Sequence, residues 1–317
     1  MKDKVDSSKI ACVIVTYNRK VLLKRCLDAV TKQTFKPCTV FIMDNASTDG
    51  TIDSVKEWGY YECQKNGIQF KYILNIKNEG GAGGFYLGMK TAFESGEYDA
   101  VWIMDDDGSP KENCLELLND CRIKEKRDYI APVVLSDEDR NSCSFWHYPI
   151  SYSDFCKRAN EKGLIENFAC PFNAILLSAK LIRTIGYPKK EMFIWGDEIN
   201  YHNRAIKAGM IPVTVTKAIH YHPKDRQMFY ELRRKYKVMI VDKDWKLYCF
   251  IRNHVYNWRF FRFWYLKWPK LIFNLVISYL YYYNKLQHDN SKNWLIIDAA
   301  FSGLVGRFSG LNKYMNK

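Results

Sequence analysis

Residues 100–112 read AVWIMDDDGSPKE, an apolar run that leads directly into three consecutive aspartates. The apolar part is short and continuous, which is typical of a buried parallel strand. Residues 109–112 carry the signals of a helix start: a capping serine, a proline at the first helical position and a glutamate that completes a capping box. Asp105, Asp106 and Asp107 are therefore expected in a short loop between a buried strand and a helix.

Three more apolar runs precede this one, at Lys9–Tyr17, Thr39–Met43 and Phe70–Leu74. Segments with helical spacing of apolar residues separate them. Strands that alternate with helices predict a parallel sheet with right-handed crossovers, in which ligands bind at the carboxyl ends of the strands. Polar residues gather at those ends: Thr16, Asn18, Arg19, Asp44, Asn45, Asn78, Glu79 and Asp105 to Asp107. The sequence thus predicts an α/β fold with one ligand-binding edge.

The rest of the chain shows a change of composition. Residues 125–170 predict irregular structure with weak strands, and 191–209 predict a loop that enters a helix closing at Gly209. From residue 224 the chain becomes basic, aromatic and helical. We therefore expect a flexible N-terminus over residues 1–8, a first module over 9–223 and a C-terminal helical module over 224–317.

The composition excludes several classes of protein. Ten scattered cysteines without a CxxC pair indicate neither a zinc nor a dithiol site, and they suit a reducing cytosol. No apolar stretch predicts a signal peptide, and the longest candidate for a membrane span, Leu271–Tyr283, has about 13 residues. The expectation is a cytoplasmic protein that does not cross a membrane.

Positive charge is concentrated in one part of the chain. The net charge is +13, and residues 224–270 hold thirteen Lys and Arg against four Asp and Glu. Aromatic residues lie among them: Phe260, Phe261, Phe263, Trp264, Tyr265 and Trp268. Such a segment binds nucleic acid, anionic lipid or a phosphorylated substrate. A solvated basic surface is the alternative.

The aspartate run has a chemical interpretation. Three adjacent carboxylates repel one another unless a cation neutralises them. Mn²⁺ or Mg²⁺ binds carboxylate and phosphate oxygens, so a metal diphosphate would relieve the repulsion. The alternative is a solvated acidic turn that caps the next helix.

A glycine-rich segment follows the third strand, with glycines at 80, 81, 83 and 84. Its spacing does not fit the GxGxxG fingerprint, and no glycine follows the first strand, which argues against a dinucleotide oxidoreductase. Adjacent glycines would allow close backbone approach to a nucleotide or sugar. A mobile linker is the alternative.

Two further clusters complete the candidate site. Trp195-Gly196-Asp197-Glu198 opens a helix, and Asp197 could both cap it and accept a proton from a hydroxyl group. His220 and His222 flank Tyr221 in an extended segment, so alternation puts both on the same side. Of the two histidines we favour His220 as the one that would complete the metal site of the acidic run.

These motifs resemble family 2 of the inverting glycosyltransferases, which have the GT-A fold. The resemblance rests on VIVTYNR (13–19), IMDNASTDGT (42–51), the glycine-rich segment 78–85, WIMDDDG (102–108) and FIWGDEINYHNRAIKAG (193–209), and it covers residues 9–225 in order. It implies that Asp197 is the general base, that Asp107 and His220 bind Mn²⁺ or Mg²⁺, and that Trp195 and Glu198 line the sugar pocket. The implied contacts with the donor nucleotide are Thr16, Asn18, Arg19, Asp44, Asn78, Gly83, Gly84, Asp105 and Asp106.

Within that family the combination of GGAGGF and DDD resembles galactofuranosyltransferases, which use UDP-galactofuranose. A rhamnosyltransferase using dTDP-rhamnose is the alternative, and a nucleotidyltransferase is a weaker one because no lysine-bearing phosphate loop occurs. The resemblance implies a role in the synthesis of capsule, O-antigen or a similar bacterial polysaccharide. A non-catalytic nucleic-acid-binding module is a further alternative that the net charge of +13 suggests, but it leaves the acidic sites at the strand ends unexplained, so we expect no nucleic-acid partner. We expect the acceptor to be lipid-linked. The basic, aromatic module would bind the anionic inner face of a bacterial plasma membrane as a peripheral protein.

Overall fold

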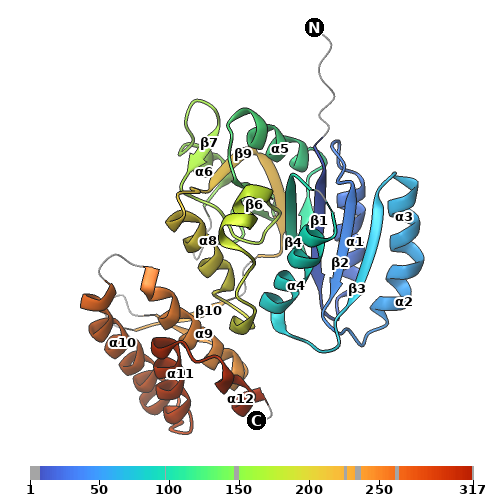
Figure 1. Cartoon of the computed structure of the whole chain (residues 1–317). Coiled ribbons are helices and arrows are strands. Elements are labelled where there is room, and N and C mark those ends of the chain that lie inside the picture. The colour runs from blue at the N-terminus through green and yellow to red at the C-terminus, as the bar shows by residue number, and fades with distance from the viewer. Residues whose placement is uncertain are drawn as a thin grey trace. The chain divides into compact units, whose positions relative to one another are not determined.

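A computed structural model describes residues 8–96, 98–145, 150–224, 227–232, 237–260 and 264–315 (Figure 1). Of Trp264, Tyr265 and Trp268 only the backbone is described. Parts of the segments discussed above lie outside the described ranges: residues 1–7, the aromatic residues Phe261 and Phe263, and five of the basic residues of 224–270, namely Arg226, Arg233, Arg234, Lys235 and Arg262.

The chain forms two compact units. The first comprises Met1–Lys190 and Tyr201–Asp225, and the second comprises Glu191–Asn200 and Arg226–Lys317. The second unit thus takes in a ten-residue segment from the middle of the chain as well as its C-terminal part.

A nine-stranded sheet forms the centre of the first unit, in the order β3-β2-β1-β4-β8-β6-β9-β5, with β7 paired to β9. Strands β3, β2 and β1 lie side by side in Figure 1. Strands β3, β2, β1 and β4 are parallel to one another, and β6 is parallel to β9, whereas β8, β7 and β5 pair in antiparallel fashion. The strands are β1 (Ile10–Thr16), β2 (Thr39–Asp44), β3 (Gln69–Leu74), β4 (Ala100–Asp105), β5 (Ser109–Pro110), β6 (Tyr129–Ser136), β7 (Leu164–Glu166), β8 (Ile175–Ser178) and β9 (Val213–His222).

Helices cover both faces of this sheet. Ile10, Cys12 and Ile14 of β1 belong to one core with α1, α3 and α5, while Ala11 and Val13 belong to the other core with α4, α7 and α8. A strand buried on both faces has a continuous apolar sequence, which explains the run in β1. The helical elements are α1 (Lys20–Thr31), α2 (Thr51–Ser54), η1 (Val55–Gly59), α3 (Tyr60–Lys65), α4 (Gly80–Glu94), α5 (Cys114–Lys124), α6 (Tyr152–Cys156), α7 (Ala179–Ile185), η2 (Lys190–Met192) and α8 (Asp197–Lys207). The expectation of an α/β fold with a largely parallel sheet flanked by helices is confirmed.

Two local predictions were wrong. Ser109 and Pro110 do not start a helix; they form β5, opposite Tyr221 and His220 of β9, and α5 begins at Cys114. Proline is tolerated there because β5 lies at the end of the sheet, where the missing N–H is not needed for a further strand. The prediction of weak strands over 125–170 also missed β6, which is buried along all eight residues.

The second unit is mainly helical, with one two-stranded antiparallel sheet. Tyr248, Ile251 and Val255 of α9 share a core with Ile296 and Ala299 of α11. In the described part of the chain, none of the helices combines the length and apolar character that a bilayer crossing requires. The elements are β10 (Met228–Glu231), β11 (Lys237–Ile240), α9 (Asp244–Asn257), η3 (Trp258–Phe260), α10 (Trp264–Tyr281), η4 (Tyr282–Leu286), α11 (Asn293–Val305), η5 (Ser309–Leu311) and α12 (Asn312–Met315).

Candidate functional site

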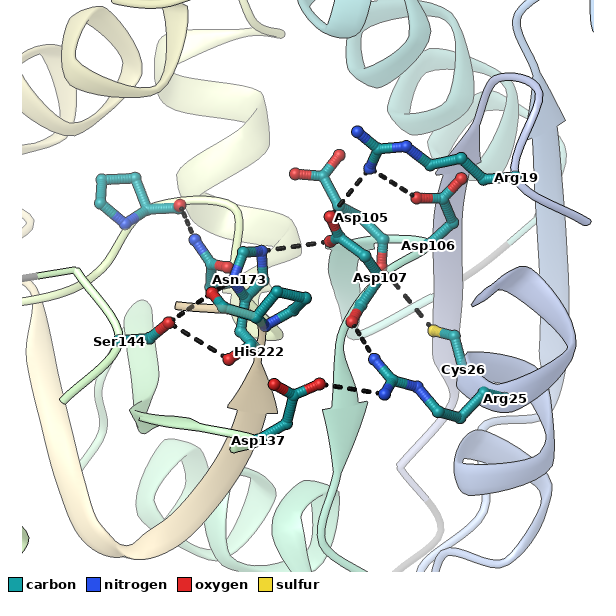
Figure 2. Close-up of polar contacts among 12 residues, drawn as sticks. Arg19, Arg25, Cys26, Asp105, Asp106, Asp107, Asp137, Ser144, Asn173 and His222 are labelled. Atoms are coloured by element: carbon teal, nitrogen blue, oxygen red, sulfur yellow. Dashed lines mark hydrogen bonds and ion pairs between the residues drawn. The ribbon is translucent and has the colours of Figure 1, made fainter. Parts of the chain in front are cut away.

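The parallel strands of the first unit bring their carboxyl ends to one edge. Thr16 at the end of β1 pairs with Asp44 of β2, and Val15 pairs with Asp105 of β4. The acidic turn 105–107 therefore lies beside the end of β1, as Figure 2 shows. This edge is the position that the alternation of strands and helices predicts for a ligand.

Asp106 points into the protein and is held there. It is 2% exposed, its Oδ2 accepts a hydrogen bond of 2.6 Å from the Thr16 hydroxyl, and its Oδ1 lies 3.3 Å from Arg19 Nη1. Burial raises the pKa of Asp106 to about 6, although the contacts with Thr16 and Arg19 oppose this rise. Asp106 thus fastens the acidic turn to β1, and Thr16 is its partner.

Asp107 is the aspartate with the most cationic surroundings (Figure 2). Arg19 Nη1 lies 2.8 Å from its Oδ2, and His222 Nε2 lies 3.1 Å from its Oδ1. Arg25 Nη2 donates a 2.6 Å hydrogen bond to the backbone carbonyl of Asp107, and Arg25 Nη1 lies 3.0 Å from Asp137. Sequence reasoning missed Arg25, because its position on α1 predicts an ordinary exposed residue.

The three carboxyl groups differ in charge. Burial and repulsion from Asp107 and Asp106 raise the pKa of Asp105 well above its usual range. Burial would also raise the pKa of Asp107, but His222 and Arg19 outweigh it and lower that pKa. The proximity of Asp107 in turn overcomes the effect of burial on His222 and raises the pKa of that imidazole. The negative charge is therefore disfavoured at Asp105 and favoured at Asp107.

The two histidines of β9 have different surroundings. His222 contacts Asp107, whereas His220, which we favoured from the sequence, is fully buried and packs against Gly108. A Cβ atom on Gly108 would lie 2.1 Å from His220 Nε2. Within the described residues neither ring nitrogen of His220 has a hydrogen-bond partner, and burial lowers its pKa to about 3. Both histidines thus lie beside the turn, but the side chain that pairs with Asp107 is His222 and not His220.

The other polar residues at the strand ends mainly bind one another. Asp44 is fully buried and accepts hydrogen bonds from the Ser47 backbone N–H, at 2.8 Å, and from the Tyr72 hydroxyl. Asn18, in a left-handed conformation, accepts a 2.7 Å hydrogen bond from the backbone N–H of Thr48. These contacts hold the loop after β2 in place beside the end of β1.

Asn78 belongs to a second network at the same edge. Asn45 Nδ2 donates to Asn78 Oδ1 at 3.1 Å and to the Gly80 carbonyl at 2.7 Å, while Asn45 Oδ1 accepts from the backbone of Glu79. Asn45 is 2% exposed and links the end of β2 to the start of α4. The sequence places Asn45 at a strand end but does not reveal this linking role.

The glycine-rich segment is helical from Gly80 onward, so it is not a loop. Gly83 and Gly84 are buried in the first turns of α4, where a Cβ atom would lie 2.4 Å from Glu79 Cβ and 2.5 Å from Val15 Cγ1, respectively. Close packing of α4 against Glu79 and against β1 therefore explains why these two positions are glycine. A bound ligand is not needed to explain them.

The remaining candidates lie in the second unit. Trp195 and Gly196 have φ angles of 57° and 93°, and Asp197 begins α8 at 4% exposure. Glu198 Oε2 accepts a 2.8 Å hydrogen bond from the Gly196 backbone N–H. An acidic residue at a helix N-terminus is favoured by the helix dipole, so Asp197 and Glu198 suit this position without further support.

The acidic turn suits a divalent cation with few protein ligands. Asp107 Oδ1 is buried without a hydrogen bond from the described residues and faces His222. Carboxylate oxygen and imidazole nitrogen together suit Mn²⁺. Within the described ranges, no three His, Cys, Asp or Glu side chains converge as a ligand set. This arrangement fits a metal that takes one or two protein ligands and completes its shell with phosphate and water oxygens.

Known proteins resemble this chain in sequence. The model of the family "Glycosyl transferase family 2" matches residues 11–185. The galactofuranosyltransferase GlfT1 of Mycobacterium tuberculosis is 33% identical over 226 residues, which are 68% of this chain and 71% of that protein.

Two solved structures share the fold. GalNAc-T7, solved with UDP, GalNAc and Mn²⁺, matches with a TM-score of 0.58 at 16% identity, over 93% of this chain and 57% of that one. TarS 1-349 of S. aureus, in complex with UDP-GlcNAc, matches with a TM-score of 0.57 at 15% identity, over 96% of this chain and 83% of that one. The chain thus spans less than two thirds of the GalNAc-T7 chain, and it spans 39% of another TarS chain. At these identities the likeness concerns the fold alone, which is of the GT-A type.

Proposed function

The chain belongs to glycosyl transferase family 2, and from this membership we propose that it transfers galactofuranose from UDP-galactofuranose to a hydroxyl group of a lipid-linked bacterial polysaccharide. The observation that carries the proposal is the contact of Asp107 with His222 at the carboxyl edge of the sheet, 3.1 Å apart. The similarity to GlfT1 over two thirds of the chain supports the choice of donor. A rhamnosyltransferase using dTDP-rhamnose is the second candidate that the experiment below includes.

Asp107 and His222 would hold the metal, Mn²⁺ or Mg²⁺. When bound, such an ion neutralises the negative charge that develops on the departing nucleoside diphosphate. Asp106 acts indirectly, since its bonds to Thr16 and Arg19 fix the turn that presents Asp107. Arg19, half exposed and bound to Asp107, supplies a second positive charge beside the diphosphate.

Asp197 would be the general base. Its carboxylate takes the proton of the acceptor hydroxyl while the acceptor oxygen forms a bond to the anomeric carbon. The bond from that carbon to the diphosphate oxygen breaks in the same step, so the anomeric configuration inverts and the nucleoside diphosphate leaves. Trp195 and Glu198, which adjoin the base in sequence, would line the pocket of the transferred sugar.

A thermal-shift screen tests the donor. UDP-galactofuranose, UDP-galactopyranose, UDP-glucose and dTDP-rhamnose are each added with and without Mn²⁺. We expect the largest rise in melting temperature with UDP-galactofuranose and Mn²⁺ together, because a ligand that binds only the folded state stabilises it. A larger rise with dTDP-rhamnose would reject the proposed donor.

Two variants then separate metal binding from base catalysis. Asp107→Ala and Asp197→Ala should each lower kcat by at least about a hundredfold, since each removes a group that acts on the transition state. Only Asp107→Ala should weaken the binding of UDP in the presence of Mn²⁺, measured by calorimetry. Equal loss of UDP binding in the Asp197→Ala variant would contradict the role of Asp197 as a base.

We also propose that the second unit binds an anionic membrane surface, where a lipid-linked acceptor would lie. Its support is a set of exposed apolar side chains on α10 and α11 that share the helical spacing of a single face on each helix. They are Leu266, Phe273, Ile277 and Tyr281 on α10, and Trp294, Ile297, Phe301 and Val305 on α11. Apolar side chains flanked by cations are the pattern of a helix that lies in the headgroup layer.

A further inference from the structure

The loop that carries Asp197 has an unusual backbone. Phe193 and Trp195 adopt φ angles of 69° and 57°, and Gly196 follows with a φ of 93°. Left-handed conformations are strained for residues with a Cβ atom, and they persist only where the surroundings enforce them. Something in the second unit must therefore hold residues 192–196 in this conformation.

Side chains of α9 provide that enforcement. Asn253 is 1% exposed, and its Nδ2 donates hydrogen bonds to the carbonyl oxygens of Met192 at 2.9 Å, Ile194 at 3.0 Å and Trp195 at 2.6 Å. The two N–H bonds of this amide group thus point at three carbonyl oxygens of the loop, those of residues 192, 194 and 195, so at least one N–H is shared between two of them. Asn257 Nδ2 donates a 2.8 Å hydrogen bond to the next carbonyl along the chain, that of Gly196.

The two asparagines are themselves held in place. Arg252 is fully buried; its Nε donates a 2.9 Å hydrogen bond to Asn253 Oδ1, and its Nη2 donates a 2.8 Å bond to the Met192 carbonyl. Asn257 Oδ1 accepts a 3.0 Å hydrogen bond from Asn200 Nδ2 on α8. Because the oxygens of both amides accept these bonds, their NH₂ groups are turned toward the loop.

Gly196 completes the fit between α9 and the loop. A Cβ atom at this position would lie 3.0 Å from Asn253 Cβ and 3.2 Å from Asn257 Nδ2. Glycine therefore permits both the left-handed backbone and the close approach of the asparagines. The residue that follows it is Asp197, the first residue of α8.

We propose that Asn253 and Asn257 are positioning residues for the transfer reaction, which act through the 192–196 backbone on the carboxylate of Asp197. This inference rests on the proposed role of Asp197 as the base. It gives α9 of the second unit a part in catalysis that is separate from the proposed membrane binding.

Near-isosteric variants test the inference. Asn253→Asp replaces the NH₂ group with an oxygen that faces three carbonyl oxygens, and Asn257→Asp removes one donor but keeps the oxygen that binds Asn200. We expect kcat to fall about a hundredfold in Asn253→Asp and about tenfold in Asn257→Asp, because small misplacements of a reacting group have effects of this size. The dissociation constant of UDP with Mn²⁺ should change less than twofold, since the proposed donor ligands belong to the first unit.

A matched control addresses stability. Tyr314 lies in the second unit and donates a buried 2.9 Å hydrogen bond to Asp298, so Tyr314→Phe removes a buried hydrogen bond without touching the loop. We expect this variant to have a lower melting temperature and an unchanged kcat. A fall in kcat in Tyr314→Phe equal to that in Asn257→Asp would overturn the inference.

A double variant separates the inference from the proposed function. In an Asp197→Ala background, Asn253→Asp should lower the residual rate less than twofold, because no base remains to be positioned. An undiminished effect in that background, or a wild-type kcat in a folded Asn253→Asp protein, would overturn the positioning role alone. Wild-type kcat in Asp197→Ala would instead reject the proposed function itself.

Discussion

His220 and His222 stand two residues apart on β9, yet among the described residues only His222 contacts an acidic side chain. Asp107 lies 3.1 Å from His222, and the pKa of this imidazole is raised, whereas burial lowers the pKa of His220 to about 3. A metal ligand must offer a lone pair toward an approachable ion, and His222 meets this condition at the acidic turn. His220 instead fills the space left by the absent side chain of Gly108.

This difference predicts distinct effects of the two alanine variants. His222→Ala should raise the dissociation constant of Mn²⁺, measured by calorimetry in the presence of UDP, by at least about tenfold. His220→Ala should leave it within threefold but lower the melting temperature, since it opens a cavity in the core. Equal loss of Mn²⁺ binding in both variants, with circular dichroism unchanged, would contradict the assignment.

The sequence predicts only part of this difference between the two histidines. Alternation along an extended segment correctly puts both histidines on one side, toward the turn. The choice between them depends on the pairing of β5 with β9, which sets Pro110 opposite His220 and Ser109 opposite Tyr221. That pairing joins residues more than a hundred positions apart, so no local pattern reveals it.

The contact between helix α4 and strand β1 is a second feature that the sequence predicts only in part. Glycines at 83, 84 and 88 form the side of α4 that meets Glu79, Val15 and Val13. Strand β1 was predictable from its continuous apolar sequence, because a strand that is buried on both faces has apolar residues at successive positions. The reason for the glycines was not predictable, because close packing of a helix and close approach of a ligand require the same small residue.

Two glycines of α4 provide a matched pair for a stability experiment. A Cβ atom on Gly84 would lie 2.5 Å from Val15 Cγ1, whereas at Gly81 nothing lies within 4 Å. Gly84→Ala should lower the free energy of unfolding by about 1–3 kcal/mol through overpacking. Gly81→Ala should leave it unchanged or raise it by up to about 1 kcal/mol, because alanine favours the helix. Urea denaturation measures both, and a Gly84→Ala protein as stable as wild type would contradict the packing explanation.

Two properties distinguish the second unit from the first: it holds most of the net positive charge, and it contains the candidate base Asp197. Residues 226–317 contain seventeen Lys and Arg and five Asp and Glu, and the difference of +12 is nearly all of the net charge of +13. The sequence shows this excess directly. It does not show that residues 191–200 join the same unit, because hydrogen bonds from α9 to a loop some sixty residues earlier create that association.

The proposed binding of a lipid surface depends on the exposed apolar faces of α10 and α11. Phe273 is 64% exposed and Phe301 is 54% exposed. Neither helix contributes an acidic residue to these faces, since Asp298, the only acid in the two helices, is buried and paired with Arg307. A second copy of the same basic unit would add like charge, so an anionic lipid surface is the better match.

Vesicle binding tests this argument. The Phe273→Ser/Phe301→Ser double variant should bind phosphatidylglycerol vesicles about ten- to a hundredfold more weakly than wild type, because each ring contributes about 1 kcal/mol when its exposed part is buried. Ile76→Ser, which alters a 99% exposed apolar residue of the first unit, is the matched control and should bind as wild type does. Raised salt and pure phosphatidylcholine should each weaken wild-type binding, since screening or removing the lipid charge removes the attraction for the basic unit. Equal binding of the double variant and wild type would show that the two helices do not meet the lipid, and equal binding to both lipids would remove the role of charge.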